Sequence, residues 1–189
     1  MKSLEDYIAA AAKNGETRSG IVLGIRMALV GLKELGVEAP SEDRTLVTFI
    51  ELDRCLPDAI ELVTGCRLGN RSLKFVDLGK MAATFVDLKS QRAIRLAARE
   101  SANQQALEEF AGLEKEEALG RAYREYPDEV LFKKEWVSVA LPPEERPGYR
   151  GPRRLCSECG EGISFHREVK KGERILCRGC AGESYWKPL

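Results

Sequence analysis

The sequence has a single histidine, His166, and few aromatic residues, which make up 7% of the chain. Catalysis of the Ser-His-Asp type needs a histidine as its base, and this histidine lies in a cysteine-rich C-terminal segment. The phosphate-loop pattern GxxxxGKS/T, the dinucleotide pattern GxGxxG after a strand and the zinc-protease pattern HExxH are absent. The residues therefore do not predict an enzyme of any of these classes.

Neither sign of charge is in excess, because 30 Lys+Arg balance 30 Asp+Glu among 189 residues. This balance argues against a strongly basic nucleic-acid scaffold and against an acidic tail protein. No apolar run approaches the roughly 20 residues of a membrane helix. Glu5 and Asp6 precede the short N-terminal apolar stretch, which is unlike a signal peptide. We therefore expect a globular, cytoplasmic protein with no membrane segment.

Four of the six cysteines lie close to the C-terminus in two C-x2-C pairs. Cys156 and Cys159 form the first pair, 17 residues separate the pairs, and Cys177 and Cys180 form the second. Two such pairs at this separation are typical of a structural Zn²⁺ site with four thiolate ligands. We therefore predict one structural zinc per chain at these four cysteines.

The segment between the two pairs alternates apolar and polar residues around a turn at Lys171-Gly172, which predicts a β-hairpin. His166 lies in this segment, where a surface or packing role is more common than ligation. Two disulfides or an iron–sulfur cluster are the alternatives at the four cysteines. Twin knuckles in a small β-ribbon favour zinc over both.

The rest of the chain predicts helices and short strands in an α+β arrangement. We expect helices over 3–13, 20–35 and 57–64, a buried strand over 45–52, and three strands over 73–77, 82–87 and 93–98. Turns between the three strands favour an antiparallel meander. Residues 101–126 are expected to be helical with a break near Gly112, and a short helix is expected after Pro127. The fold class is α+β, an antiparallel sheet packed with helices, plus a small C-terminal zinc-ribbon module.

The segment LPPEERPGYRGPRR holds four prolines and is the clearest domain boundary. We expect a core domain over 1–140, a linker over 141–154 and a zinc-binding ribbon over 155–189. Residues 146–189 carry ten Lys+Arg and five Asp+Glu. Four zinc-bound thiolates add back about two negative charges, so the case for a nucleic-acid partner is weak.

Three stretches resemble the FmdE family, which is associated with the FmdE subunit of molybdenum or tungsten formylmethanofuran dehydrogenase. They are GIVLGIRMALVGLKELG, LVTFIELDRCLPDAIELVTGC and LKFVDLGKMAATFVDLKSQRAIRL. The resemblance runs from about Asn14 to about Arg99, and family members often carry a C-terminal zinc finger. It implies an α+β core, a homodimer and a pocket in the core domain.

The chain departs from the family at the segment that precedes the second expected helix. Members typically have phenylalanine-histidine-glycine-histidine-x-cysteine-proline-glycine there. Here Asn14 and Glu16 replace both histidines, Arg18 replaces the cysteine and Ser19 replaces the proline. Because three candidate metal ligands are lost, a second metal in the core is not expected, although Glu16 could still ligate one.

The downstream part of the family pattern is retained, so the resemblance implies a candidate core pocket. Its residues are Glu16, Arg18, Arg26, Asp53, Cys55, Asp58, Cys66 and Lys80. Arg18, Arg26 and Lys80 would suit a small anionic ligand and would stabilise a thiolate nearby. From the residues alone, Cys55 and Cys66 read as buried small hydrophobic residues rather than as residues that line a site. The retained family pattern brings the two interpretations level.

Three functions remain open from the sequence. The first is an FmdE-like accessory or ligand-binding protein of formylmethanofuran dehydrogenase-type C1 metabolism, with other subunits as partners and the zinc ribbon as an interaction module. The second is a metal- or thiol-dependent enzyme component that uses Cys55. The third is a zinc-ribbon regulator that binds nucleic acid through basic residues of the C-terminal segment. Whether the isolated chain catalyses a reaction is left open.

Overall fold

The computed structural model describes residues 2–12, 17–38 and 45–187. The chain divides into two compact units, Met1–Ala140 and Leu141–Leu189. The finer division of the second unit into a linker over 141–154 and a ribbon over 155–189 stays a prediction. Among the described residues, none of the helices has the length and apolarity needed to cross a membrane.

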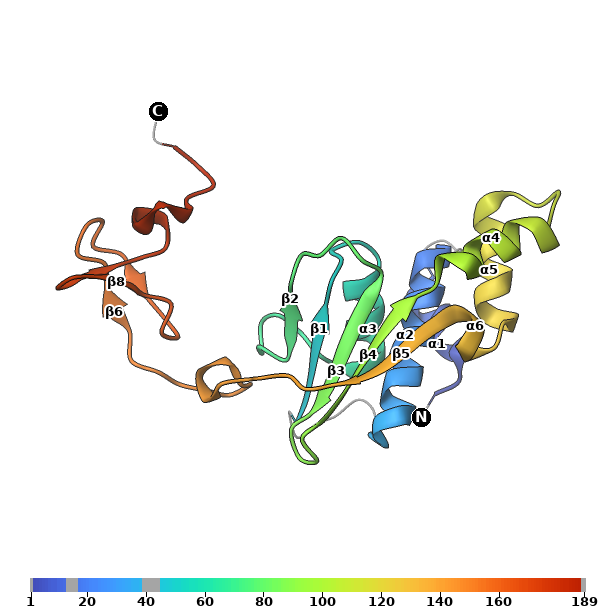
Figure 1. Cartoon of the computed structure of the whole chain (residues 1–189), viewed down its shortest axis with the longest axis horizontal. Coiled ribbons are helices and arrows are strands. Elements are labelled where there is room, and N and C mark those ends of the chain that lie inside the picture. The colour runs from blue at the N-terminus through green and yellow to red at the C-terminus, as the bar shows by residue number, and fades with distance from the viewer. Residues whose placement is uncertain (1, 13–16, 39–44, 188–189) are drawn as a thin grey trace. The chain divides into compact units, whose positions relative to one another are not determined.

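The first unit combines six helices with five strands over the residues that the structure describes. In chain order they are α1 (Leu4–Ala11), α2 (Ser19–Leu35), β1 (Leu46–Ile50), α3 (Leu56–Thr64), β2 (Leu73–Phe75), β3 (Ala82–Asp87), β4 (Arg92–Ala98), α4 (Glu100–Glu109), α5 (Lys115–Glu125), α6 (Asp128–Leu131) and β5 (Phe132–Val137). The strands form one sheet in the order β2-β1-β3-β4-β5 (Figure 1). Helices and sheet pack together, so the predicted α+β class is confirmed.

One edge of the sheet departs from the predicted meander. The β1–β3, β3–β4 and β4–β5 pairs are antiparallel, but β2 pairs in parallel with β1 and does not lie beside β3. Helix α3 connects β1 to β2, and two parallel neighbours need a crossover connection of this kind. The local turn at Gly79-Lys80 therefore does not make a hairpin, because β1 already occupies the position beside β3.

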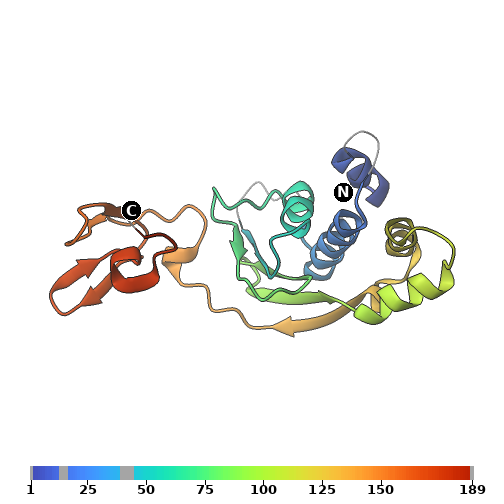
Figure 2. The same cartoon turned by 90° about the horizontal axis from the view of Figure 1, so that it is seen from above.

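Helix α2 is the centre of the hydrophobic core and lies with α3 on one face of the sheet (Figure 2). Two glycines allow its close approach. A Cβ atom at Gly31 would lie 2.4 Å from the Phe85 ring on β3, and one at Gly24 would lie 2.6 Å from the Cβ atom of Ala59 on α3. The helix ends at Gly36, whose φ of 70° lies in the left-handed region.

The segment after Pro127 also differs from the prediction. Only Asp128–Leu131 is helical, and Phe132–Val137 continues as edge strand β5. Pairing with β4 decides this outcome, because Glu135 lies opposite Arg95 and the Arg95 guanidinium binds both Glu135 and Glu51. The predicted break near Gly112 is confirmed, since α4 ends at Glu109 and α5 begins at Lys115.

The second unit is built from short strands, which lie in β6 (Arg154–Leu155), β7 (Gly162–Ile163), β8 (Val169–Lys171) and β9 (Arg174–Leu176), with helical turns η1 (Pro143–Glu145) and η2 (Gly179–Glu183). The β8–β9 pair is the hairpin predicted between the cysteine pairs. Gly172 turns it with a φ of 61°. Gly160 follows the first cysteine pair with a left-handed φ of 76°, and Gly179 begins η2.

Candidate functional site

The four C-terminal cysteines come together at one point of the second unit. Cys156 and Cys159 follow β6, Cys177 follows β9, and Cys180 lies in η2. Their Sγ atoms all lie within 4.8 Å of one another. In a tetrahedral site with Zn–S bonds of about 2.3 Å, ligand sulfur atoms lie about 3.8 Å apart. The Sγ atoms of Cys159 and Cys177 are 3.9 Å apart, which matches this spacing.

Backbone N–H groups prepare these sulfur atoms for a cation. The Cys177 N–H donates to the Cys156 Sγ at 3.3 Å, and the Cys180 N–H donates to the Cys177 Sγ at 3.3 Å. Backbone N–H groups, that of Cys159 foremost, lower the pKa of Cys156 to about 6. Sharing of hydrogen bonds with Cys177 raises the pKa of Cys180. Four thiols held so close favour a bound cation that deprotonates them all.

His166 is placed outside this cluster by its own contacts. The Tyr149 hydroxyl and the His166 Nε2 are 2.7 Å apart. A Cβ atom at Gly151 would lie 3.2 Å from the same nitrogen, so the backbone at Gly151 lies close to the His166 ring. His166 is thus an exposed residue that contacts Tyr149 within the second unit and is not part of the cysteine cluster.

A second candidate site lies in the first unit, where α2 and α3 both begin. It consists of two recesses, of about 480 and 860 Å³. Arg18, Arg54, Cys55 and Glu116 line both of them. Apolar walls complete the smaller recess with Leu52 and Met81, and the larger one with Ala10, Ala11, Ile21 and Leu62.

Cys55 occupies an unusual backbone position in this site. It precedes α3 with φ 60° and ψ −45°, and the Leu56 N–H donates to the Arg54 carbonyl at 2.6 Å. This is a tight γ-turn, which is strained for any residue other than glycine. A Cβ atom at Gly20 would lie 3.2 Å from the Cys55 Sγ, so the thiol lies against the first turn of α2.

Some charged side chains of the site are hydrogen-bonded within the first unit, and others have no partner among the described residues. Glu116, from α5, accepts a hydrogen bond of 2.6 Å from the Ser19 N–H and so caps α2. The side chains of Arg18 and Arg54 make no ion pair or hydrogen bond with the described residues. Asp53 and Asp58 line only the larger recess. The smaller recess therefore offers a thiol, two arginines and the Glu116 carboxylate that caps α2.

Comparison with known proteins agrees with this arrangement. A sequence model described as "FmdE, Molybdenum formylmethanofuran dehydrogenase operon" matches residues 15–136. The chain belongs to the FmdE family. We call its first unit, Met1–Ala140, the FmdE unit. A second model, of the prokaryotic dksA/traR C4-type zinc finger, matches residues 151–185 and so covers all four clustered cysteines.

Two individual proteins resemble the FmdE-family chain over most of its length. A probable S-adenosyl-L-methionine-binding protein of Archaeoglobus fulgidus is 34% identical over an alignment of 188 positions, and the match covers 87% of this chain. The match covers 49% of that protein, so the chain spans about half the length of this curated relative. The crystal structure of a tungsten formylmethanofuran dehydrogenase FmdE-like protein from Syntrophus aciditrophicus has a TM-score of 0.65 at 25% identity, with 98% of this chain and 96% of that chain covered.

The FmdE unit brings together only part of the pocket expected from the sequence. Arg18, Asp53, Cys55 and Asp58 line the recesses, whereas Arg26, Cys66 and Lys80 do not. Cys66 is 2% exposed, and its thiol donates to the Leu46 carbonyl at 3.6 Å. Lys80 is exposed and stays outside both recesses. Glu16 lies outside the described residues.

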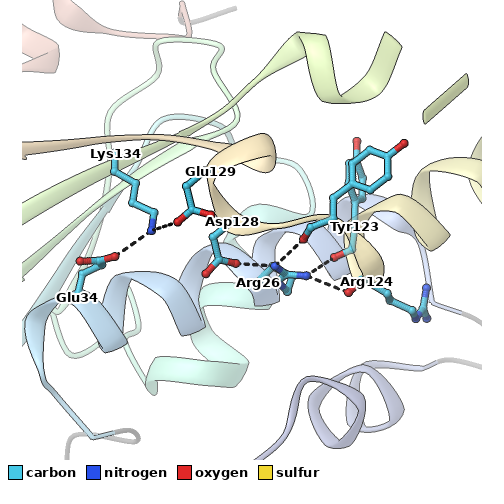
Figure 3. Close-up of polar contacts among 8 residues, drawn as sticks. Arg26, Glu34, Tyr123, Arg124, Asp128, Glu129 and Lys134 are labelled. Carbon is cyan, nitrogen blue, oxygen red and sulfur yellow. Dashed lines mark hydrogen bonds and ion pairs between the residues drawn. The ribbon is translucent and has the colours of Figure 1, made fainter. Parts of the chain in front are cut away.

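Arg26 holds two helices of the FmdE unit together instead of lining the pocket (Figure 3). Its guanidinium projects from α2 and donates to the carbonyls of Tyr123, Arg124 and Tyr126, each at 3.0 Å. It also forms an ion pair with Asp128 at 2.5 Å. These carbonyls end α5, where a cation is favourable. The structure thus gives Arg26 a structural role that the family pattern did not predict.

Two residues of the pocket were missed by the sequence interpretation. Arg54 stands between Asp53 and Cys55 in the retained pattern, so its position next to the cysteine was an available signal. Glu116 lies 97 residues from the Ser19 N–H that it caps. No local pattern connects α5 with the start of α2, so only the fold shows this residue to be part of the site.

Proposed function

We propose that this FmdE-family chain is an accessory protein that binds a small anionic molecule in the pocket around Cys55. The observation that carries the proposal is the pair Arg18 and Arg54. Both arginines are exposed and line both recesses, and neither side chain makes an ion pair or hydrogen bond with the described residues. Planar guanidinium groups bind carboxylate and phosphate groups through paired hydrogen bonds.

Calorimetric titration with phosphate and with suberate, an eight-carbon dicarboxylate, tests this proposal on the zinc-loaded full chain. We expect binding that weakens at least about tenfold in the Arg18→Gln/Arg54→Gln variant, since each lost charged hydrogen bond is worth about 1.5–3 kcal/mol when shielded and less at an open site. Lys80→Gln is the matched control, because Lys80 is an exposed cation outside both recesses. Equal binding by all three proteins would overturn the proposal.

The second part of the proposal concerns the C-terminal unit, which we infer holds one structural zinc per chain. The four close sulfur atoms and the C4-type zinc-finger match support this metal. We propose that this unit serves protein interaction, within a cytoplasmic homodimer or with other formylmethanofuran dehydrogenase-type subunits. One zinc per chain by elemental analysis, lost in Cys156→Ser/Cys177→Ser, is the expected result. Metal that persists in this variant would place a site elsewhere in the chain.

A second candidate ligand comes from the printed name of the Archaeoglobus relative. S-Adenosyl-L-methionine carries a carboxylate together with two cationic groups, and the larger recess presents Arg18 and Arg54 beside Asp53 and Asp58. Titration with S-adenosylhomocysteine and with methylthioadenosine, which lacks the amino-acid group, separates this candidate from simple anion binding. Preference for the former, lost in Asp53→Asn/Asp58→Asn, would support it.

A further inference from the structure

The pocket of the FmdE unit places a free thiol beside two guanidinium groups, which defines a ligand class more narrowly than charge alone. We propose that the pocket takes anionic low-molecular-weight disulfides, and that Cys55 exchanges with them to form a mixed disulfide. The inference rests on the proposed function, because it specifies the ligand of the same pocket. The product is a protein that carries an anionic thiol covalently on Cys55.

The position of Cys55 makes its sulfur available for such an exchange. The γ-turn at Arg54–Leu56 turns Cys55 out of the helical path that begins at Leu56. Its side chain lines both recesses and is partly exposed. Gly20 leaves space for the sulfur, since a Cβ atom there would approach the Sγ to 3.2 Å. An incoming disulfide can therefore reach this sulfur from the recess.

Charge around the sulfur selects among disulfides. Arg18, Arg54 and Glu116 line both recesses together with Cys55, whereas Asp53 and Asp58 line only the larger one. In the smaller recess two arginines therefore stand against a single carboxylate, which accepts the Ser19 N–H at the start of α2. A carboxylate bound to either guanidinium would hold the S–S bond of a short dithio acid close to the thiol. The same two arginines repel a cationic disulfide, so its reaction with Cys55 is slower.

The exchange balances without another reactant. Cys55 gives its thiol proton to water and attacks one sulfur of the disulfide as a thiolate. A new S–S bond forms to Cys55 while the ligand's own S–S bond breaks. The released sulfur leaves as a thiolate, takes up a proton from water and is the reduced product. A second small thiol reverses the reaction by the same steps.

The mixed disulfide should persist, because the pocket offers no second thiol among the residues that the structure describes. Cys66 is buried, donates to the Leu46 carbonyl and lines neither recess. The bound thiol is therefore not displaced by an internal disulfide within the FmdE unit. The bound thiol is released only by an external thiol, as in a carrier or sensor of small anionic thiols.

Three disulfides of similar size but different charge test the inference on the zinc-loaded full chain. They are 3,3′-dithiodipropionate, which is anionic, bis(2-hydroxyethyl) disulfide, which is neutral, and cystamine, which is cationic. Mass spectrometry of the Cys55 peptide measures the rate at which each reagent forms its mixed disulfide. Each rate is divided by the rate of the same reagent with a neutral one-cysteine reference peptide, which removes differences in intrinsic reactivity. We expect the anionic reagent to exceed the cationic one at least about tenfold in these normalised rates.

The variants and one unreactive probe make every outcome decisive. The preference should disappear in Arg18→Gln/Arg54→Gln and persist in Lys80→Gln, while Cys55→Ser gives no adduct at this position. Suberate has the same two carboxylates as dithiodipropionate but no S–S bond. If suberate binds and Cys55 shows no anionic preference in its reaction, the disulfide inference fails and the proposed function stands. If suberate does not bind and no preference is seen, both fail.

Discussion

Replacing Arg26 with methionine tests whether this residue joins α2 to the end of α5 or serves the pocket. Arg26→Met keeps most of the side-chain length but removes the guanidinium. The Arg26 side chain is 13% exposed, and its guanidinium makes hydrogen bonds to three carbonyls as well as an ion pair with Asp128. Its loss leaves the last carbonyls of α5 and the Asp128 carboxylate without this cation (Figure 3).

The size of the effect follows from the partial burial of these groups. Removing one partner of a fully buried pair costs about 3–5 kcal/mol. Asp128 is 23% exposed, so water can replace part of the lost interaction. We therefore expect Arg26→Met to lower the free energy of unfolding of the FmdE unit by about 2–3 kcal/mol. In a unit of this size the melting temperature should fall by about 5–12 °C.

Urea unfolding followed by circular dichroism measures this change, and Lys133→Met is the matched control. Lys133 also pairs with a carboxylate, Glu135, at 2.8 Å, but its side chain is 59% exposed. Such a surface pair is worth about 0–1 kcal/mol. Suberate binding should be unchanged in both variants at temperatures where they are folded. An Arg26→Met protein as stable as Lys133→Met, or one that loses suberate binding, would refute the assignment of Arg26 to the helix contact.

Three further predictions concern packing, pH and metal. Gly31→Ala should lower the free energy of unfolding by about 1–3 kcal/mol in urea, because its Cβ would clash with the Phe85 ring. In the control Gly120→Ala, the added Cβ meets only the flexible end of an arginine, so the free energy of unfolding should rise by up to about 1 kcal/mol. Equal effects of the two substitutions would contradict the close approach of α2 to the sheet. Burial and nearby carboxylates raise the pKa of both Tyr123 and Tyr126 to about 12. Because the folded state holds these protons more tightly, the stability that they contribute is complete below pH 10 and is lost between about pH 10 and 12; a Tyr123→Phe/Tyr126→Phe protein should show a shallower loss over that range, and an unchanged pH dependence would refute this cause. Chelation of the zinc should abolish amide hydrogen-exchange protection in β8 and β9 while α2 stays protected; protection that survives in the hairpin would mean that the second unit folds without metal.

The cluster of four cysteines could be predicted from the sequence because its determinants are local. Two C-x2-C knuckles and one hairpin lie within a segment whose ends are Cys156 and Cys180. Knuckle geometry turns each pair of thiols to one side, and an antiparallel hairpin returns the second pair to the first. The order of the elements in the FmdE unit was also largely evident, since buried faces follow helical or strand periodicity.

Contacts between segments that are distant along the chain could not be determined from the sequence. The position of β2 beside β1, and the conversion of Phe132–Val137 into β5, depend on which strand edges remain free after the others have paired. Glu116 reaches Ser19 across 97 residues, and Arg26 reaches Asp128 across 102. The sequence by itself determined which residue types were available, namely a thiol, two kinds of charge and four cysteines at zinc-ligand spacing. Only the packing of α2 against α3 and α5 decided that Arg18 and Arg54 line the pocket with Cys55, whereas Arg26 binds the end of α5. The reason is that the direction of a side chain is set by tertiary contacts, which no local sequence pattern encodes.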